Sequence, residues 1–286
     1  MIYCILVSYK PDPSQLNNTV QSIINQVDKL VIVKNSNENI NIFNGKIHII
    51  QLEKNFGIAY AQNRGIEFAI SENAEYVFFS DQDSIYPEDF IKKSMNCFAR
   101  HTGEPVAAVV PYFYNNNKKQ FTTINITKTN SIVPEHDKDY EVQHAISSGT
   151  VSPCTVFQEI GLMNERLFID WVDYEWCWRA IEKKYKIVCD TSNIINHNMG
   201  DSFKTVFGRK IVVYSDFRSY YFFRNGTYLL FHSGLFTIKE WVGFCVFMTI
   251  KTILFYITSG FSIKHIKLIF KAKYRGIENT FTIEKE

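Results

Sequence analysis

The chain lacks the cysteine patterns that build zinc sites and redox motifs. Its 286 residues include six scattered cysteines, with no Cys-x-x-Cys and no closely spaced Cys/His pair. Four of these cysteines lie among apolar or aromatic residues, as unpaired cysteines of cytosolic proteins commonly do. The sequence therefore predicts free thiols and a reducing compartment.

A strong charge of either sign is also missing. Lysine plus arginine (31) nearly balances aspartate plus glutamate (29), and the net charge of +2 gives no case for a nucleic-acid partner. Residues 1–7 are apolar, but they lack the charged leader and the longer hydrophobic region that a signal peptide needs. We therefore interpret them as part of a first strand.

No internal repeat is visible, and up to about residue 110 short β-branched or aromatic runs alternate with longer amphipathic ones. Strands are predicted over residues 2–8, 29–34, 46–51, 76–80 and 106–110. Helices are predicted over 13–26, 57–72 and 87–100, with start signals at Asp12 before Pro13, at Gly57, and at Pro87 before Glu88 and Asp89. Strands separated by crossover helices predict an α/β fold with a mostly parallel, twisted, Rossmann-like sheet and helices on both faces.

Beyond residue 110 the pattern changes. Residues 112–145 are polar and rich in Asn, Lys and Thr, so we expect an excursion or a pair of exposed strands there rather than core. Residues 146–200 are dense in aromatic and acidic side chains, and after 210 the chain becomes strongly aromatic and then basic. The last change indicates a C-terminal helical extension.

The most informative stretch is the hydrophobic run 76–80, which ends in Asp81-Gln82-Asp83. Carboxylates at the C-terminal tip of a parallel strand lie where open α/β sheets bind ligands, and two of them suit a hard divalent cation. Alternate residues of an extended strand point the same way, so both carboxylates could share one ion with a diphosphate. The alternative is a simple turn after the strand.

Residues 168–180 crowd three tryptophans among acidic residues. A purely structural interpretation is that the segment begins a helix, with Asp170 or Asp173 as the N-cap. Glu175 and Arg179 would then form an ion pair one turn apart. This explains the acids but not the tryptophans, and aromatic rings beside carboxylates suit a sugar-binding cleft. We therefore favour a catalytic role for the segment.

Residues 55–65 carry small residues and amides at the start of a predicted helix. A helix N-terminus with glycine and alanine offers backbone amides at close approach to a ligand. Alone the signal is weak, because Gly57 is equally consistent with a turn. The signal gains weight because the segment lies one strand–helix unit before the aspartate pair.

A single histidine, His197, follows a predicted strand over 186–189. A lone histidine is more often a polar surface residue than a ligand. This one could nevertheless complete a metal shell with Asp83.

Together these residues resemble the family 2 inverting glycosyltransferases of the GT-A fold, and among them the bacterial rhamnosyltransferase-like members that build surface polysaccharides. The motifs that carry the resemblance are Val7-Ser8-Tyr9, Val33-Lys34-Asn35-Ser36, Asn55 to Gly65, Asp81-Gln82-Asp83, Ser147-Ser148-Gly149, Ile160 to Glu165, Phe168 to Arg179, and His197. The resemblance implies a GT-A domain over 1–225, with a nucleotide-sugar-binding half over about 1–110 and an acceptor and catalytic half over 111–225. A C-terminal region, 226–286, would follow.

The resemblance also implies a role for each matched residue. The nucleotide pocket would be lined by Ser8, Tyr9, Asn35, Asn55, Gly57 and Asn63. Asp81 would lie near the ribose or the metal, and Asp83 would bind Mg²⁺ or Mn²⁺ together with His197. Asp173 matches the family's catalytic aspartate. The acceptor side would be formed by Ser148, Gly149, Trp171, Glu175 and Trp176.

Two positions depart from the family pattern. Lys34 stands where many relatives carry an aspartate near the base, which leaves nucleobase recognition open. Val172 replaces the acid that often precedes the catalytic aspartate.

The residue types suit a single inverting displacement. A divalent cation stabilises the negative charge that builds on a nucleoside diphosphate leaving group. One carboxylate, Asp173, then suffices as the base for the acceptor hydroxyl. A retaining hydrolase is disfavoured, because no second acid with a separate role appears at helical or strand spacing.

The resemblance implies L-rhamnose from dTDP-L-rhamnose as the donor sugar and a lipid-linked glycan as the acceptor. A haloacid-dehalogenase-type phosphatase is an alternative, because a strand ending in residues 81–84 also fits its motif with Asp81 as nucleophile. Against it, about 80 residues of α/β units precede the motif and no convincing acidic pair follows. A non-catalytic glycan-binding membrane protein would not need both Asp83 and Asp173.

The C-terminal region predicts contact with a membrane. Residues 241–257 form a hydrophobic run of 17 residues, which is short for a span of about 20, so we expect a buried or interfacial helix. Beyond it, Lys264, Lys267, Lys271 and Arg275 recur at helical spacing beside an apolar face. This predicts peripheral attachment to the anionic inner face of a bacterial plasma membrane, with a homo-oligomer contact or a cover over the core as the alternatives.

Overall fold

The computed structural model describes residues 1–37, 40, 42, 44–116, 119–197, 203–206, 209–212, 214–260 and 262–281. Within them, one nine-stranded sheet has the spatial order β3-β2-β1-β4-β10-β5-β11-β9, with β6 beside β5. Its strands are β1 (Ile2–Ser8), β2 (Lys29–Lys34), β3 (Ile47–Gln51), β4 (Tyr76–Ser80), β5 (Val106–Asn115), β6 (Gln120–Phe121), β9 (Asp139–Val142), β10 (Val151–Pro153) and β11 (Lys186–His197). Two small pairs lie apart from it: β7 (Ile124–Asn125) with β8 (Ser131–Ile132), and β12 (Phe203–Val206) with β13 (Arg209–Val212).

The sheet is parallel through its N-terminal half, where β3, β2, β1 and β4 are parallel neighbours. β5 and β11 are also parallel, whereas β10 runs antiparallel to both β4 and β5, and β9 runs antiparallel to β11. The predicted mostly parallel arrangement is therefore confirmed, with antiparallel strands inserted in the second half.

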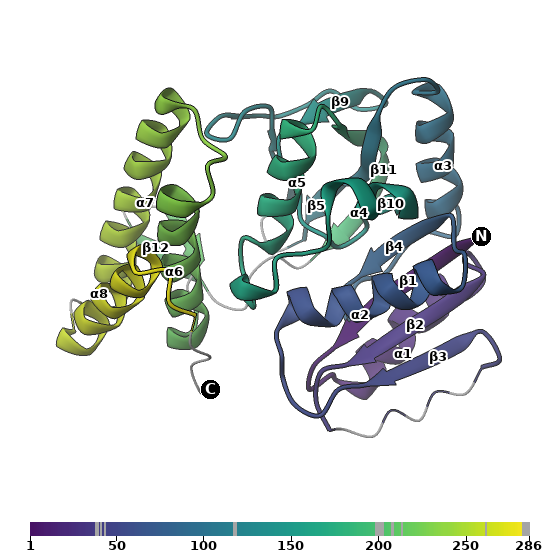
Figure 1. The fold of residues 1–286 in the computed structure, drawn as a ribbon, viewed down its shortest axis with the longest axis horizontal. Coiled ribbons are helices and arrows are strands. Elements are labelled where there is room, and N and C mark those ends of the chain that lie inside the picture. Colours follow the sequence, from purple (N-terminus) through teal and green to yellow (C-terminus); the bar gives the residue numbers. More distant parts are fainter. Residues whose placement is uncertain are drawn as a thin grey trace.

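Helices cover both faces of the sheet (Figure 1). They are α1 (Pro13–Ile23), α2 (Ile58–Ser71), α3 (Phe90–Arg100), α4 (Cys154–Ile160) and α5 (Val172–Glu182), with a 3₁₀ turn over Glu165–Leu167. Successive strand residues face opposite sides of a sheet. Accordingly Ile5 and Val31 pack into the cluster that contains α2, whereas Cys4 and Leu30 pack into the cluster that contains α1 and α3. All of these strand side chains are fully buried.

The helix starts were predicted with mixed success. The side chain of Asp12 accepts hydrogen bonds from two backbone amides at the start of α1, each at 2.9 Å. Gly57, with a φ of 87°, precedes α2 as predicted. The prediction for α3 was wrong, because that helix begins only at Phe90 and leaves Glu88 and Asp89 before its first turn.

The segment expected to leave the core at residue 112 instead continues β5 to Asn115. Tyr112 and Phe113 are buried. The reason is the length of β11, whose residues Ile194 to His197 pair with this extension and satisfy its backbone groups. After Asn115 the chain forms the short strands β6 to β9, of which β6 and β9 join the main sheet, and within these described strands only Ile124 and Val142 reach the core as buried hydrophobic residues.

Three helices form the C-terminal part: α6 (Asp216–His232), α7 (Ile238–Thr258) and α8 (Ile263–Ile277). They stand together to one side of the sheet in Figure 1. The boundary drawn at residue 225 falls inside α6. α7 is long and apolar enough to cross a membrane by length and composition. Only 17% of its apolar window is buried, so of the two expected forms, a buried or an interfacial helix, the buried one is excluded and the interfacial one stays a prediction.

Candidate active site

Three adjacent parallel strands end at the same edge of the sheet. Ser8 ends β1 opposite Lys34 at the end of β2, and Ser80 ends β4. Each is followed by a residue of the predicted site, namely Tyr9, Asn35 or Asp81. The carboxyl edge of such strands is the usual ligand-binding side of an open α/β sheet.

Gln82, the residue between the two aspartates, fastens the loop after β4 to the loop after β1. Its side-chain oxygen accepts from the backbone amide of Tyr9 at 2.7 Å, and its side-chain nitrogen donates to the carbonyl of Tyr9 at 3.1 Å. The hydroxyl of Thr19 in α1 donates to the carbonyl of Gln82 at 3.1 Å. These contacts fix the backbone between Asp81 and Asp83.

Asn35 organises the turn that leads into α2. Its side-chain nitrogen donates to the side chain of Asn55 at 2.9 Å, and its side-chain oxygen accepts from the amide of Phe56 at 2.9 Å. The Asn55 side chain also accepts from the amide of Gly57 at 2.9 Å. The structure therefore brings Ser8, Tyr9, Asn35, Asn55 and Gly57 together, and their contact with a nucleotide stays a prediction.

Asn63 does not join this group. Both ends of its buried side-chain amide bind the backbone of Met163, at 3.0 and 2.9 Å, and its nitrogen also reaches Glu165 at 2.9 Å. The side chain of Asn63 thus links α2 to the 3₁₀ turn and to the residues just before it by hydrogen bonds. Its predicted place in the nucleotide pocket was wrong, because its hydrogen-bonding groups are already used.

The segment 147–150 runs along the end of β4 and supports the aspartate loop from beneath. The hydroxyl of Ser148 lies 3.1 Å from that of Ser84 and 3.2 Å from that of Tyr86, and all three side chains are buried. Gly149 has a φ of 80°, and a Cβ there would come within 2.6 Å of Pro111. These two residues support the loop, which differs from the predicted direct contact of Ser148 and Gly149 with the acceptor.

Asp173, in the first turn of α5, is held by two backbone amides. Its carboxylate accepts from Ser147 at 3.1 Å and from Tyr174 at 3.0 Å. The hydroxyl of Ser147 in turn accepts from the side chain of Gln62 in α2 at 3.1 Å. Burial raises the pKa of Asp173 to about 7, the two amides oppose this rise, and the nearby carboxylate of Asp170 adds to it. A carboxylate with such a pKa is suited to accept a proton near neutral pH.

Asp170 lies beside Asp173 and is paired with Arg218 of α6. The guanidinium donates to one carboxylate oxygen at 3.0 and 3.1 Å and to the other at 3.3 Å. Burial raises the pKa of Asp170, and the charge of Arg218 works against that rise. The two neighbouring aspartates thus have different surroundings, and only Asp170 has a cationic partner among these contacts.

The backbone that carries these aspartates is held in an uncommon conformation. Phe168, Asp170 and Trp171 have φ values of 66°, 59° and 69°, and such left-handed positions cost about 1–3 kcal/mol each outside glycine. The side-chain nitrogen of Asn225 offsets this cost by donating to the carbonyls of Leu167, Ile169 and Asp170 at 2.7, 2.8 and 3.1 Å.

Two further contacts secure the same loop. Arg224, buried next to Asn225 in α6, donates to the carbonyls of Arg166 at 2.8 Å and Leu167 at 3.0 Å. From the opposite side, the amide of Ile58 at the start of α2 donates to the carbonyl of Phe168 at 2.7 Å. The loop is therefore fixed between α2 and the C-terminal helix α6.

The tryptophans near Asp173 form core rather than an open sugar platform. Trp171 and Trp176 are buried, and their ring nitrogens donate to the carbonyls of Phe222 at 2.9 Å and Gly161 at 3.0 Å. Glu175 is also buried and forms the predicted ion pair with Arg179, at 2.8 Å. We assign all three to packing, in contrast to their predicted contact with the acceptor.

The alternative reading of Asp170 or Asp173 as the N-cap of α5 does not hold. The capping position is taken by Trp171, which has no side-chain capping bond. Asp170 precedes it and Asp173 follows it inside the first turn, so neither carboxylate serves as the cap.

His197 ends β11 opposite Asn115 of β5. Its side chain lies outside the described part of the structure, so its role as a metal ligand stays a prediction. Away from this edge, potential ligand atoms of Cys97, His101 and Asp139 lie within 4.8 Å of one another. The carboxylate of Asp139 is already bound by Arg100 at 2.7 and 2.8 Å, which gives this group the character of an ion-pair network.

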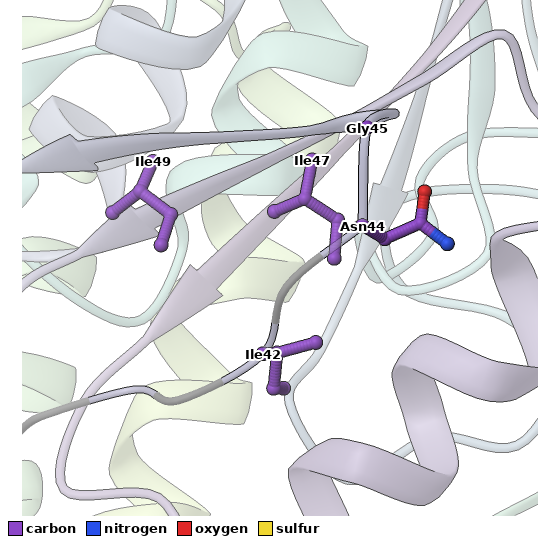
Figure 2. Close-up of a pocket in the computed structure, with 5 residues that line it drawn as sticks. All are labelled: Ile42, Asn44, Gly45, Ile47 and Ile49. Carbon is purple, nitrogen blue, oxygen red and sulfur yellow. The ribbon is translucent and has the colours of Figure 1, made fainter.

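A shallow pocket lies on the edge strand β3, lined by Ile42, Asn44, Gly45, Ile47 and Ile49 (Figure 2). Ile47 pairs with Leu30 near the start of β2, so the pocket is at the amino end of the strands. It contains no titratable side chain. The pocket is therefore distinct from the site at the carboxyl edge.

Sequence reasoning missed the residues that position the site rather than line it, namely Gln62, Gln82, Ser147, Arg218, Arg224 and Asn225. One signal was available: Arg224-Asn225 is a polar pair inside a strongly aromatic stretch, and buried polar groups require partners. The partners themselves are distant in the sequence.

Comparison with known proteins identifies the class. The model of the family "Glycosyl transferase family 2" matches residues 4–161, more than half of the chain. The chain therefore belongs to glycosyl transferase family 2. The matched part contains the aspartate loop and the segment 147–150, whereas Asp173 and α6 lie beyond it.

Individual relatives agree with this assignment. The chain is 32% identical over 289 residues to the dTDP-rhamnosyl transferase RfbF of Shigella flexneri, covering 96% of this chain and 95% of the relative. It is 25% identical over 239 residues to the low-salt glycan biosynthesis hexosyltransferase Agl10 of Haloferax volcanii, covering 78% of this chain and 75% of the relative. The protein is a glycosyltransferase, which sets aside the phosphatase and the non-catalytic glycan-binding protein.

The fold agrees as well. The crystal structure of GalNAc-T7 with UDP, GalNAc and Mn²⁺ matches with a TM-score of 0.58 and 13% sequence identity. The match covers 91% of this chain and 57% of that one. At this identity the likeness concerns the fold alone, and it confirms the predicted GT-A architecture.

Proposed function

We propose that this protein transfers L-rhamnose from dTDP-L-rhamnose, with inversion, to a hydroxyl group of a lipid-linked polysaccharide precursor at the cytoplasmic face of a bacterial membrane. The similarity to a dTDP-rhamnosyl transferase along 96% of the chain supports the donor. The second relative is named for glycan biosynthesis and supports a glycan acceptor.

The observation that carries the mechanism is the setting of Asp173. In a single inverting displacement, the acceptor oxygen forms a bond to the anomeric carbon while the bond to the diphosphate breaks. The hydroxyl proton passes to a base opposite the leaving group. Asp173 has the raised pKa, of about 7, that makes a carboxylate an effective proton acceptor. Ser147 and Tyr174 hold its two oxygens in place.

The aspartate loop suits a divalent cation. Asp81 is partly exposed and Asp83 is exposed, directly beyond β4, and carboxylate oxygens are the ligands that Mg²⁺ and Mn²⁺ favour. A bound cation would neutralise charge on the departing diphosphate. The Mn²⁺ and UDP bound by GalNAc-T7 support this assignment through the shared fold. His197 is proposed as a further ligand.

The nucleotide would lie over the ends of β1 and β2. Tyr9 and the turn at Asn35, Asn55 and Gly57 border that position. Because the side-chain amides of Asn35 and Asn55 bond to each other, we assign them to shaping the turn. Tyr9 is then the residue proposed to contact the nucleotide.

A donor screen tests the proposal. Purified protein is incubated with a panel of nucleotide sugars, a glycan acceptor and Mg²⁺ or Mn²⁺, and release of nucleoside diphosphate is measured. We expect preference for dTDP-L-rhamnose and an inverted anomeric configuration in the product, read by NMR spectroscopy. Asp83→Ala and Asp173→Asn should each lose at least about a hundredfold in rate, the range of one general base or a metal ligand.

The control is Asp137→Asn, an exposed aspartate between β8 and β9. It should transfer sugar at the wild-type rate. Full transfer by Asp173→Asn to a true acceptor would disprove the base assignment, and preference for another nucleotide sugar would disprove the donor.

A further inference from the structure

The outer face of α7 is an exposed apolar stripe. Ile238, Val242, Val246, Ile250 and Ile253 recur at intervals of three or four residues, which places them on one side of the helix, and all five are exposed. On the inner face, Phe244 and Met248 are buried against the core. Scattered apolar residues are normal on a surface, but a continuous stripe marks an interaction site.

α8 repeats this pattern and adds charge. Its exposed apolar residues follow one face: Ile263, Ile266, Phe270, Tyr274 and Ile277. Lys264, Lys267 and Lys271 are exposed beside that face. From residue 241 to 277 the sequence contains five lysines and one arginine but no aspartate or glutamate. The partner of this surface must therefore combine apolar material with negative charge, as an anionic bilayer does.

The connections of α7 show how it can meet a bilayer. α8 runs parallel to α6, because Asp216 at the start of α6 binds Lys264 at 2.6 Å and His265 at 3.0 Å at the start of α8. At the other end, the ring of His232 in α6 lies 2.6 Å from the carbonyl of Ile277. In the chain, α7 leads from the end of α6 back to the start of α8, so both of its ends are joined to helices of the folded protein.

Close packing prevents α7 from leaving this position. A Cβ on Gly226 of α6 would come within 2.5 Å of Met248 of α7. The ring of Trp171 lies 5.2 Å from Phe244 and 6.2 Å from Phe247, measured between ring centroids. An α7 that crossed the membrane would lose these contacts. Its length and apolar composition, which would allow a crossing, therefore do not decide how it lies relative to the membrane.

We propose that the exposed faces of α7 and α8 bind an anionic lipid bilayer, with α7 lying in the plane of the membrane rather than crossing it. This proposal extends the proposed function to the membrane. It depends on that function only for the identity of the acceptor. Trp171 joins α7 to the loop that carries Asp170 and leads to Asp173. A lipid-linked acceptor would thus be held near the proposed base.

Co-sedimentation of the full-length protein with vesicles tests the surface. We expect the protein to pellet with phosphatidylcholine vesicles that contain phosphatidylglycerol, and to do so far less with phosphatidylcholine alone or at high salt. The double variants Val246→Glu/Ile250→Glu and Lys267→Glu/Phe270→Glu should each bind roughly tenfold or more weakly. The matched control is Ile49→Glu, which changes an exposed isoleucine on β3, far from α7 in Figure 1.

Four further measurements separate the possible outcomes. Thermal melting should show the variants folded, and transfer to a soluble acceptor should stay at the wild-type rate. An alkaline wash should release the protein from the vesicles, whereas retention would overturn the in-plane orientation. No binding to anionic vesicles would overturn the proposal. A dimer that is seen by light scattering and that the variants abolish would assign the face to a second copy of the chain instead. Vesicle binding without any sugar transfer would leave this surface standing and remove the proposed function.

Discussion

The side-chain nitrogen of Asn225 donates a hydrogen bond to the carbonyl oxygen of Leu167 at 2.7 Å, across 58 positions of sequence. The same nitrogen reaches two more carbonyls of the loop that precedes α5. A residue of the C-terminal helices therefore holds the backbone that positions the proposed base, although it lies outside the part matched by the family model.

Replacing Asn225 should damage catalysis and stability together. Asn225→Asp keeps the size and the oxygen that accepts from Arg224 at 2.8 Å, but it removes the donor to the three carbonyls. The carbonyl of Leu167 keeps its bond from Arg224, so the carbonyls of Ile169 and Asp170 lose this donor. A buried carbonyl left unpaired costs about 1–3 kcal/mol. We expect unfolding at clearly lower denaturant concentration and a kcat at least about tenfold lower with a nearly unchanged KM for the donor. A variant with normal kcat would show that the loop does not need this clamp.

Gly57→Ala tests the contact between α2 and the same loop. A Cβ at this position would lie 2.5 Å from the carbonyl oxygen of Phe168. Gly103→Ala is the matched control, because Gly103 has a similar φ, 89° against 87°, with no atom within 4 Å of the added Cβ. In both variants the strained backbone conformation should lower the free energy of unfolding by about 1 kcal/mol or more. Only Gly57→Ala should also lose transfer activity, and equal activity in the two would contradict the proposed coupling.

The rate of transfer should depend on the protonation of Asp173. A base must be deprotonated to accept the hydroxyl proton, and the pKa of Asp173 is raised to about 7 by burial. We expect kcat/KM to fall about tenfold for each pH unit below that pKa. Binding of the nucleotide, followed by calorimetry over the same range, should change far less. A rate profile that stays flat well into the acidic range would contradict the assignment.

The raised pKa of Asp173 also predicts a stability effect of opposite sign to the activity effect. Because the folded state holds this proton more tightly than the unfolded state, folding stability declines as pH rises from the ordinary carboxyl range to about 7. Asp173→Asn removes the titration and should be more stable than the wild type above neutral pH, by about 1–2 kcal/mol. The difference should shrink in acid, as shown by denaturant melts at several pH values. An asparagine variant that is less stable at every pH would contradict this account.

Removal of divalent cations should stop transfer. We expect a chelator to abolish nucleoside diphosphate release and added Mn²⁺ or Mg²⁺ to restore it, with Asp83→Asn needing a much higher metal concentration. His101→Ala is the control, since His101 belongs to the second group of possible ligands, with Cys97 and Asp139. Its metal dependence should match that of the wild type, and a change there would move the functional ion to that group.

Much of the first half of the fold could be predicted because its signals are short-range. The strands 2–8, 29–34 and 76–80 have the predicted bounds. The cap at Asp12 and the glycine before α2 are decided by a few neighbouring residues. The prediction failed at β5, whose last residues are polar and aromatic and become a strand only because β11 lies beside them.

The candidate site divides in the same way. The carboxylates of Asp81, Asp83 and Asp173 were proposed from residue type and order, together with the turn residues near Asn35, and the structure leaves that proposal standing. Asn63 and the tryptophans were misplaced, because a sequence motif does not say whether a side chain faces a ligand or the protein interior. Burial decides that question, and burial depends on elements far away along the chain.

By itself the sequence determined the alternation of strands and helices, the carboxylates at the sheet edge and the basic, apolar character of the C-terminal region. These follow from local propensity and composition. Only the tertiary structure decided that Ser147 holds Asp173, that Asn225 holds the loop before it, and that α7 is packed along α6 with one face exposed. The physical reason is that hydrogen bonds and packing join residues which the backbone brings together only after folding.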